Sequence, residues 1–350
     1  MRQDTVIQDS SRGEVPSLKE VWKNSFSIGA AIEPYQTTGK HAELLKKHFS
    51  SIVAENVMKP GLIAPKRNEY FWDDADSIIA FAGKNHLKVR FHTLVWHNQT
   101  ADWFFQDEEG NPLKENPEHK QLLLDRLKEY IRVVGNRYKN AIESWDVVNE
   151  VIDPDQPDGL RRSTWFNITG TDYIETAFRT AREVLGPEAK LFINDYNTND
   201  PKKREFLYEL VKDLQSKGVP IDGVGHQMHI NLEWPSVSTI SETIDLFANL
   251  GLDNKVTEMD ISIYENDKDT YETVPQDLLA KQGKRYQEIF DLFKSKKGKI
   301  SQVITWGIAD DHTWKTNFPI KRIDLPLLFD QEHLPKPAFW GIVDPSKLKE

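Results

Sequence analysis

Two kinds of hydrophobic pattern alternate along the chain. Short apolar runs that often end in a polar residue are typical of strands buried on both faces. Longer segments carry apolar residues every three or four positions, as Leu123, Leu127, Ile131 and Val134 do, which indicates amphipathic helices. The runs predict strands at residues 26–31, 51–56, 88–96, 142–148, 190–195, 224–229, 255–261 and 303–308. The periodic segments predict helices at 17–22, 40–48, 73–85, 117–138, 172–185, 201–217, 239–250, 277–297 and 337–343.

This alternation predicts the fold class. Strands that alternate with helices form parallel units, and eight of them within 350 residues favour an α/β protein, a single-domain (β/α)8 TIM barrel. An open doubly wound sheet is the alternative, but the chain has no G-x-G-x-x-G or Walker motif to bind phosphate. No Gly/Ser-rich linker divides the chain. We expect one domain at residues 17–345, preceded by a flexible segment at 1–16.

Composition and charge narrow the classes of partner. The net charge of −10 argues against nucleic acid and anionic membrane surfaces, which both require a basic patch. No apolar run is long enough to span a membrane. The chain contains no cysteine, which excludes disulfides and thiolate metal sites. Residues 1–15 lack the apolar core of a signal peptide, so we expect an extracellular protein whose leader is missing from this sequence, or alternatively a cytoplasmic one.

Polar and aromatic side chains gather where the predicted strands end. In a TIM barrel these carboxyl ends meet on one face, which carries the active site. Tryptophans in polar loops, such as Trp314, suggest in addition a surface that stacks on hydroxylated ligands. The strand-end residues are Glu55, Asn56, His92, Trp96, His97, Asn149, Glu150, Asn194, Asp195, Tyr196, Gln227, His229, Glu258, Asp260, Trp306 and Asp310. The pattern predicts one shared site.

Two carboxylates in this set differ in their surroundings. Glu258 has His229 and Asp260 nearby, and a chain His229–Glu258–Asp260 would keep it ionised as a nucleophile requires. A buried ion pair is the alternative for an inward Glu, but Lys59 is the only Lys or Arg expected near a neighbouring strand end. Glu150 has no obvious charge partner, which suits a general acid. Two unlike carboxylates are the arrangement that glycosidic bond cleavage requires.

The histidine spacings do not predict a metal site. His226 and His229, like His92 and His97, lie an odd number of positions apart on a strand, so the members of each pair face opposite sides. The chain has no H-x-H or H-E-x-x-H motif. We expect neither a metal nor another cofactor.

Five segments together resemble one enzyme family. They are Glu-Asn-Val-Met-Lys at 55–59, His-Thr-Leu-Val-Trp-His at 92–97, Trp-Asp-Val-Val-Asn-Glu at 145–150, Asn-Asp-Tyr-Asn at 194–197 and Thr-Glu-Met-Asp at 257–260. Over about residues 26–340 the chain resembles glycoside hydrolase family 10, the endo-β-1,4-xylanases. The resemblance implies a TIM barrel that hydrolyses internal bonds of xylan or xylooligosaccharides with retention of anomeric configuration.

The resemblance also implies a role for each matching residue. Glu150 is similar to the acid/base and Glu258 to the nucleophile. His229 and Asp260 resemble the network that holds the nucleophile, and Asn149 resembles the residue that hydrogen-bonds the sugar 2-hydroxyl. The glycone side would be lined by Glu55, Asn56, Lys59, His92, Trp96, Gln227, Trp306 and Trp314, and the aglycone side by Tyr196.

Double displacement through these two carboxyl groups sets two geometric expectations. The groups should lie about 5–5.5 Å apart, since inverting enzymes need room for a water between them. A regular strand would turn Asn149 and Glu150 to opposite faces, so we expect a twist or bulge where this strand ends. The loop at 310–325 is expected to shape the glycone side.

Two other functions stay open from the sequence. One is activity on β-1,4-glucan, whose sugars each carry an extra hydroxymethyl group that Trp306 and Trp314 would exclude. The other is a barrel that binds carbohydrate without catalysis, against which Glu150, Glu258 and His229 are all present. The expected partners are xylan and xylooligosaccharides, and a monomer is favoured.

Overall fold

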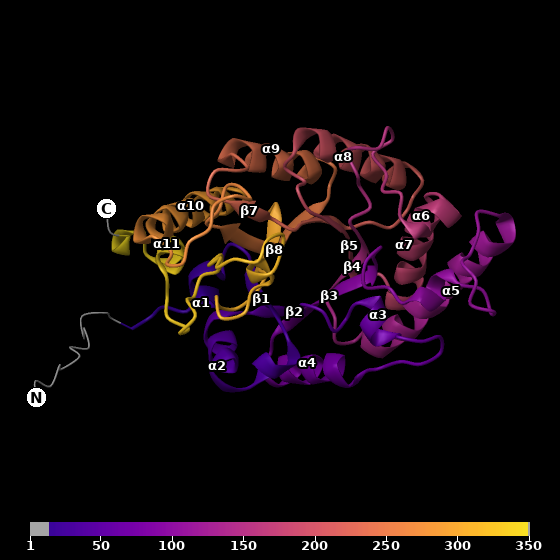
Figure 1. Ribbon diagram of the computed structural model, residues 1–350, viewed down its shortest axis with the longest axis horizontal. Helices are drawn as coiled ribbons and strands as arrows, with labels where there is room; N and C mark the ends of the chain where they lie inside the picture. Colours follow the sequence, from indigo (N-terminus) through magenta and orange to yellow (C-terminus); the bar gives the residue numbers. More distant parts are fainter. Residues whose placement is uncertain (1–13, 349–350) are drawn as a thin grey trace, which may run out of the picture.

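The computed structural model describes residues 14–348, and its centre is a closed barrel of parallel strands (Figure 1). Strands pair in the order β6-β5-β4-β3-β2-β1-β9-β8, and β6 also pairs with β8, which closes the ring. The barrel strands are β1 (Ser27–Ile32), β2 (Ser51–Ala54), β3 (Lys88–Val95), β4 (Ser144–Asn149), β5 (Lys190–Asp195), β6 (Gly223–His226), β8 (Asp253–Ser262) and β9 (Ile300–Thr305). The prediction of a (β/α)8 TIM barrel is confirmed.

The barrel strands are buried on both faces, which explains their nearly continuous apolar sequence. One face points into the barrel and helices cover the other. In β4, for example, Trp145 is fully buried and its ring stacks on Phe91 of β3, with ring centroids 4.8 Å apart. Packing of this kind between neighbouring strands holds their carboxyl ends at fixed positions.

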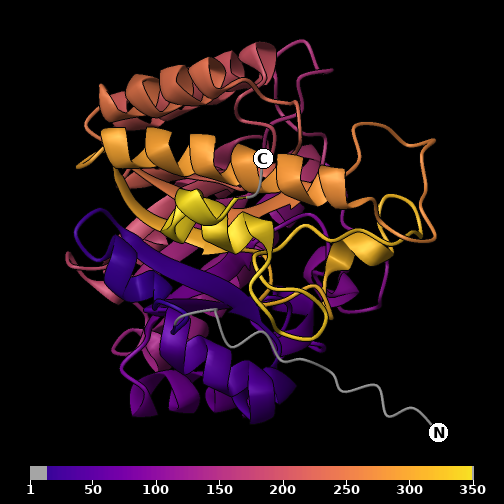
Figure 2. The same cartoon turned by 90° about the vertical axis from the view of Figure 1, so that its left-hand side faces the viewer.

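A ring of helices encloses the barrel (Figures 1 and 2). Polar caps fix where some of them begin: Asn116 Oδ1 accepts from the backbone N–H of His119, 2.8 Å away, at the start of α5. The helices are α1 (Leu18–Trp22), α2 (Gly39–His48), α4 (Asp73–Lys84), α5 (Pro117–Tyr138), α7 (Asp172–Leu185), α8 (Pro201–Ser216), α9 (Val237–Ala248), α10 (Gln276–Ser295) and α11 (Pro337–Val343). The predicted helix bounds agree with these to within two residues.

The strand predicted at 224–229 is wrong in one respect, because the structure divides it. β6 ends at His226, and a separate strand, β7 (His229–Asn231), pairs with the end of β8 so that His229 lies opposite Asp260. Between the two strands, Met228 has a φ of 61°, a left-handed conformation that interrupts the extended backbone. The break places His229 beside the end of β8.

Two further predictions are corrected. The last strand, predicted at 303–308, is β9 and ends at Thr305, so Trp306 belongs to the loop after it. Six short helices that the sequence does not predict lie between or after the predicted elements, because each is too short to show a hydrophobic period. They are η1 (Pro34–Thr37), α3 (Pro60–Ile63), η2 (Asp102–Phe105), α6 (Thr164–Thr169), η3 (Trp314–Thr316) and η4 (Pro345–Lys347).

Within residues 14–348, no helix combines the length and the apolar character needed to cross a membrane. The flexible segment predicted at 1–16 lies largely outside the described residues. It stays a prediction, as do the bounds 17–345 of the domain.

Candidate active site

A cavity of about 660 Å³ opens where the barrel strands end at their carboxyl termini. Every residue to which the family resemblance assigns a role lines it except Asp260, which is buried directly behind His229. Of the other predicted strand-end residues, His97 lines the cavity, whereas Asn194, Asp195 and Asp310 are buried outside its lining. The predicted residues that line it are Glu55, Asn56, Lys59, His92, Trp96, Asn149, Glu150, Tyr196, Gln227, His229, Glu258, Trp306 and Trp314. The structure therefore brings the sequence-predicted residues together in one place.

The end of β4 departs from a regular strand, as expected. The pairing of β4 with β5 shifts register between Asp146 and Val148, and Glu150 has a φ of 59°. A left-handed residue other than Gly costs about 1–2 kcal/mol. Backbone hydrogen bonds offset this cost, because the Glu150 N–H donates to Asn194 O at 2.9 Å and Arg161 Nε donates to Glu150 O at 2.6 Å. Asn149 and Glu150 can therefore both face the cavity.

The Glu150 carboxylate accepts hydrogen bonds from neutral groups. Trp96 Nε1 donates to Oε2 at 2.8 Å, and Gln227 Nε2 donates to Oε1 at 3.0 Å. These donors fix the position of the carboxylate without pairing it with a cation, which agrees with the expectation that Glu150 lacks a charge partner.

Glu258 has a different environment, since two imidazoles lie beside its carboxylate. His229 Nε2 lies 3.0 Å from Oε2, and His92 Nε2 lies 3.8 Å from Oε1. On its other side the His229 ring contacts Asp260, with Nδ1 to Oδ2 at 2.9 Å. The order is therefore Glu258–His229–Asp260, not the predicted His229–Glu258–Asp260. The reason is that residues 258 and 260 lie on one face of β8, and β7 places the imidazole between them.

The charges in this network act on each other strongly. Burial alone would raise the pKa of Glu258, but His92, His229 and Arg90 together hold it at about 2. Burial would likewise lower the pKa of His229, yet Asp260 and Glu258 raise it to about 10. Glu258 is therefore ionised and His229 protonated across the neutral range.

Arg90 corrects the expectation that Lys59 alone supplies positive charge near Glu258. Arg90 is fully buried in β3, where Nη1 lies 3.4 Å from Asp146 Oδ2 and Nη2 donates to Thr257 O at 3.3 Å. Asp146 in turn contacts His92 Nδ1 at 2.8 Å. Arg90 and Asp146 lie within apolar strand sequences, so only the strand register reveals their link to the site.

Three amides join the two carboxylates. Gln227 contacts Glu150, Asn194 Nδ2 donates to Glu258 Oε1 at 3.0 Å, and the amide of Asn149 contacts both Gln227 and Asn194. The close packing requires a glycine, because a Cβ on Gly225 would lie 2.3 Å from Asn194 Oδ1. The positions of the two carboxylates are thus coupled through fixed polar groups.

Polar contacts hold the cavity wall that comes from β2. His312 Nε2 lies 2.7 Å from Glu55 Oε2, and Asn56 Nδ2 donates to Glu33 Oε1 at 2.5 Å. Lys59 Nζ donates to Asn56 Oδ1 and lies 4.9 Å from the centre of the Trp96 ring. This wall offers charged and amide groups to a ligand with several hydroxyls.

Aromatic rings form two further parts of the wall. Trp306 packs edge-on against His92, and Trp314 lies over His229 while its Nε1 donates to Asp260 Oδ2 at 2.7 Å. On the opposite side, Arg161 Nη2 donates to the Tyr196 hydroxyl at 3.0 Å. The sequence prediction omitted the lining residues Asn98, Gln99, Arg161, Asn197 and Phe318.

Comparison with known proteins identifies the family of this site. The family profile described as "Glycosyl hydrolase family 10" matches residues 17–345. The chain belongs to glycosyl hydrolase family 10. Its relatives include the "Thermostable celloxylanase" of Thermoclostridium stercorarium, 55% identical, with 97% of this chain and 90% of the relative covered. "Endo-1,4-beta-xylanase A" of Halalkalibacterium halodurans is 49% identical, with 95% and 87% covered.

A solved structure supports the same assignment. Xylanase B from Clostridium stercorarium F9 is 56% identical and superposes with a TM-score of 0.93, covering 95% of this chain and 100% of that one. The family resemblance noted from the five segments is therefore confirmed.

Two groups of possible metal ligands lie at the cavity of this family 10 enzyme. His92, Asp146 and Glu258 form one group. The positive charge of Arg90, which lies beside Asp146, would repel a metal ion at this position. Glu33, Glu55 and His312 form the other. In both groups the ligand atoms already form the hydrogen bonds and ion pairs that position the cavity wall.

Replacement of His229 by Asn should change how the rate depends on pH. The substitution removes the imidazolium charge that offsets the effect of burial on Glu258. The pKa of Glu258 should therefore rise by about 1–3. The nucleophile role predicted for Glu258 requires an ionised carboxylate, so the acid limb of kcat/KM should move to higher pH by the same amount. The measurement is kcat/KM for an aryl xylobioside as a function of pH, with His86→Asn as the matched control. An acid limb that stays where it is in the wild type would contradict this role.

Proposed function

We propose that this family 10 glycoside hydrolase is a retaining endo-β-1,4-xylanase that cleaves internal bonds of xylan and xylooligosaccharides by double displacement. The observation that carries the proposal is the contrast between the carboxylates. Glu258 is paired with the protonated imidazole of His229, whereas Glu150 is held by neutral donors. Family 10 retains anomeric configuration, and the similarity to named xylanases supports the substrate.

In the first step Glu258 attacks the anomeric carbon while Glu150 gives its proton to the leaving glycosidic oxygen. The bond to the leaving sugar breaks as the bond to the Glu258 carboxylate forms. In the second step Glu150 takes a proton from a water, which attacks the same carbon and releases Glu258. The expected carboxyl separation of about 5–5.5 Å, which suits this sequence of steps, stays a prediction.

Residues in different walls of the cavity have different supporting roles. His229 and Asp260 keep Glu258 charged and oriented, and Asn149, beside both carboxylates, is placed to bond the 2-hydroxyl of the sugar being attacked. Tyr196 offers a ring to the leaving portion of the substrate. On the glycone side we assign sugar contacts to Glu55, Asn56, Lys59, His92, Trp96, Gln227, Trp306 and Trp314.

Azide rescue of alanine variants tests the two catalytic roles. Glu150→Ala should slow xylan hydrolysis by about 10²- to 10⁴-fold, the usual contribution of an acid/base. With an activated aryl xylobioside, azide should attack the glycosyl-enzyme of this variant and give the β-glycosyl azide. Glu258→Ala should lose on the order of 10⁴-fold or more in rate, and azide in place of the carboxylate should give the α-glycosyl azide.

Two further results complete this test. Glu183→Ala, an exposed residue of α7, should hydrolyse xylan like the wild type. Glu258→Ala should still bind xylooligosaccharide, measured by calorimetry. Undiminished hydrolysis by Glu258→Ala, or the opposite azide anomers, would refute the assignment and would reopen a barrel that only binds carbohydrate.

Specificity between xylan and glucan should depend on the aromatic wall. We expect Trp306 and Trp314, which line the cavity, to exclude a hydroxymethyl group, so xylan should be cleaved about 10- to 200-fold faster than carboxymethyl cellulose. Trp314→Ala should narrow this ratio, and Trp234→Ala, whose ring lies outside the cavity, should preserve it. Equal rates on both polymers would favour a mixed activity of the kind that the name of the celloxylanase relative suggests.

We further propose that the enzyme acts outside the cell, because polymeric xylan cannot cross a membrane. Activity on insoluble xylan should then be found in the culture supernatant of the source organism. Recovery of the enzyme only from washed, broken cells would instead favour a cytoplasmic enzyme that hydrolyses imported xylooligosaccharides.

A further inference from the structure

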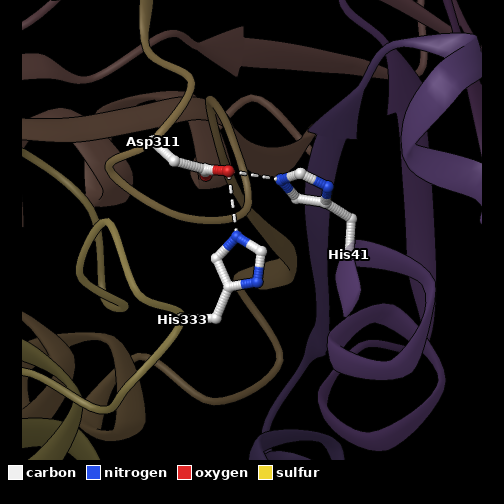
Figure 3. A group of neighbouring side chains, drawn as sticks. All are labelled: His41, Asp311 and His333. Carbon is white, nitrogen blue, oxygen red and sulfur yellow. Dashed lines mark hydrogen bonds and ion pairs between the residues drawn. The ribbon is translucent and has the colours of Figure 1, made fainter. Parts of the chain in front are cut away.

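A group of three side chains outside the cavity joins three separate parts of the chain (Figure 3). His41 lies in the first turn of α2, Asp311 follows β9, and His333 lies in the turn before α11. The Nε2 atoms of both imidazoles point to one carboxylate oxygen, Asp311 Oδ2, at 2.8 Å from His41 and 2.9 Å from His333. None of these residues takes part in the proposed reaction.

From this geometry we propose that His41, Asp311 and His333 form a binding site for a divalent transition metal such as Zn²⁺. Two imidazole nitrogens and one carboxylate oxygen are a ligand set that transition metals prefer, whereas Ca²⁺ and Mg²⁺ favour oxygen. The three ligand atoms lie within 4.8 Å of one another. One or two waters would complete the coordination.

The site needs only a small adjustment to accept the ion. Zinc bonds of about 2.0–2.1 Å place neighbouring tetrahedral ligand atoms roughly 3.3–3.5 Å apart. The two contacts to Asp311 must therefore lengthen by roughly half an ångström as the metal replaces the shared hydrogen bonds. The side chains are 15%, 27% and 12% exposed for His41, Asp311 and His333, so the site is held in place yet open to solvent.

A turn with an unusual backbone conformation holds the His333 side chain in position. His333 has a φ of 67°, a left-handed conformation that is uncommon for a residue other than Gly. Asp330 holds the turn, because its Oδ1 accepts from the backbone N–H groups of Glu332 and Leu334, each at 2.9 Å. Strain of this kind persists where surrounding contacts require it, and it often marks a functional position.

The metal would fasten the loop after β9 to the first turn of α2. Asp310 is already anchored, since its carboxylate pairs with Lys336 Nζ at 2.6 Å. His312, on the other side of Asp311, reaches Glu55 in the cavity wall at 2.7 Å. The ring of Tyr35 packs edge-on against both His41 and His312. A metal at Asp311 would therefore stabilise the fold next to the glycone side without entering the cavity.

Zinc titration of the metal-stripped, full-length protein tests the proposal. Calorimetry should show one Zn²⁺ bound per chain to the wild type. His41→Gln and His333→Asn should weaken binding on the order of tenfold or more, because even the loss of an outer hydrogen-bond partner of a ligand costs 10–100-fold. The matched control is His86→Asn, since His86 is exposed and also left-handed, with a φ of 56°. It should bind zinc like the wild type.

Two readouts keep the test decisive if a variant folds poorly. Zinc should raise the Tm of the wild type and of His86→Asn, and a chelator should reverse the rise, since a ligand that binds only the folded state stabilises it. Co²⁺ added to the wild type should give visible bands of a low-symmetry, nitrogen-ligated ion. Absence of zinc binding by the wild type, binding that is unaffected by His41→Gln and His333→Asn, or equal stabilisation by Ca²⁺ would each overturn the proposal.

Discussion

The protonated imidazole of His229 between the carboxylates of Glu258 and Asp260 is the interaction on which the site depends. Burial of a carboxylate without a nearby cation would cost several kcal/mol of folding free energy, and burial of an imidazolium without carboxylates would also be unfavourable. The three groups are therefore stable only together. Asn194 and Trp314 supply hydrogen bonds to the two ends of this chain, so β5 and the loop after β9 both help to hold the two carboxylates in place.

The break between β6 and β7 makes this arrangement possible. An unbroken strand from 223 to 231 would continue beside β5 and β8 and carry His229 past the end of the barrel. The left-handed residue Met228 instead turns the chain so that β7 pairs with β8 opposite Asp260. Gln227, just before the break, reaches Glu150. One local irregularity therefore positions partners for both carboxylates.

The sequence predicts the barrel, the main helices and most residues of the cavity, because period and strand-end position are local properties. It does not predict Arg90 and Asp146, which are hidden within apolar strand sequences and reach the site only through the register of β3, β4 and β8. Arg161 is missed for another reason. It belongs to an irregular loop after β4, and only the folded path of that loop brings its guanidinium to Tyr196 and to the backbone of Glu150.

The loop after β9 shows how a few consecutive residues can connect stability with the site. Asp310, Asp311 and His312 follow the end of a strand, where the alternation of two faces stops, and each side chain takes its own direction. The first pairs with Lys336, the second with His41 and His333, and the third with Glu55. Because the backbone between them is short, any contact that fixes Asp311 also restricts His312. The position of Glu55 in the cavity therefore depends on contacts made at the outer surface of the barrel.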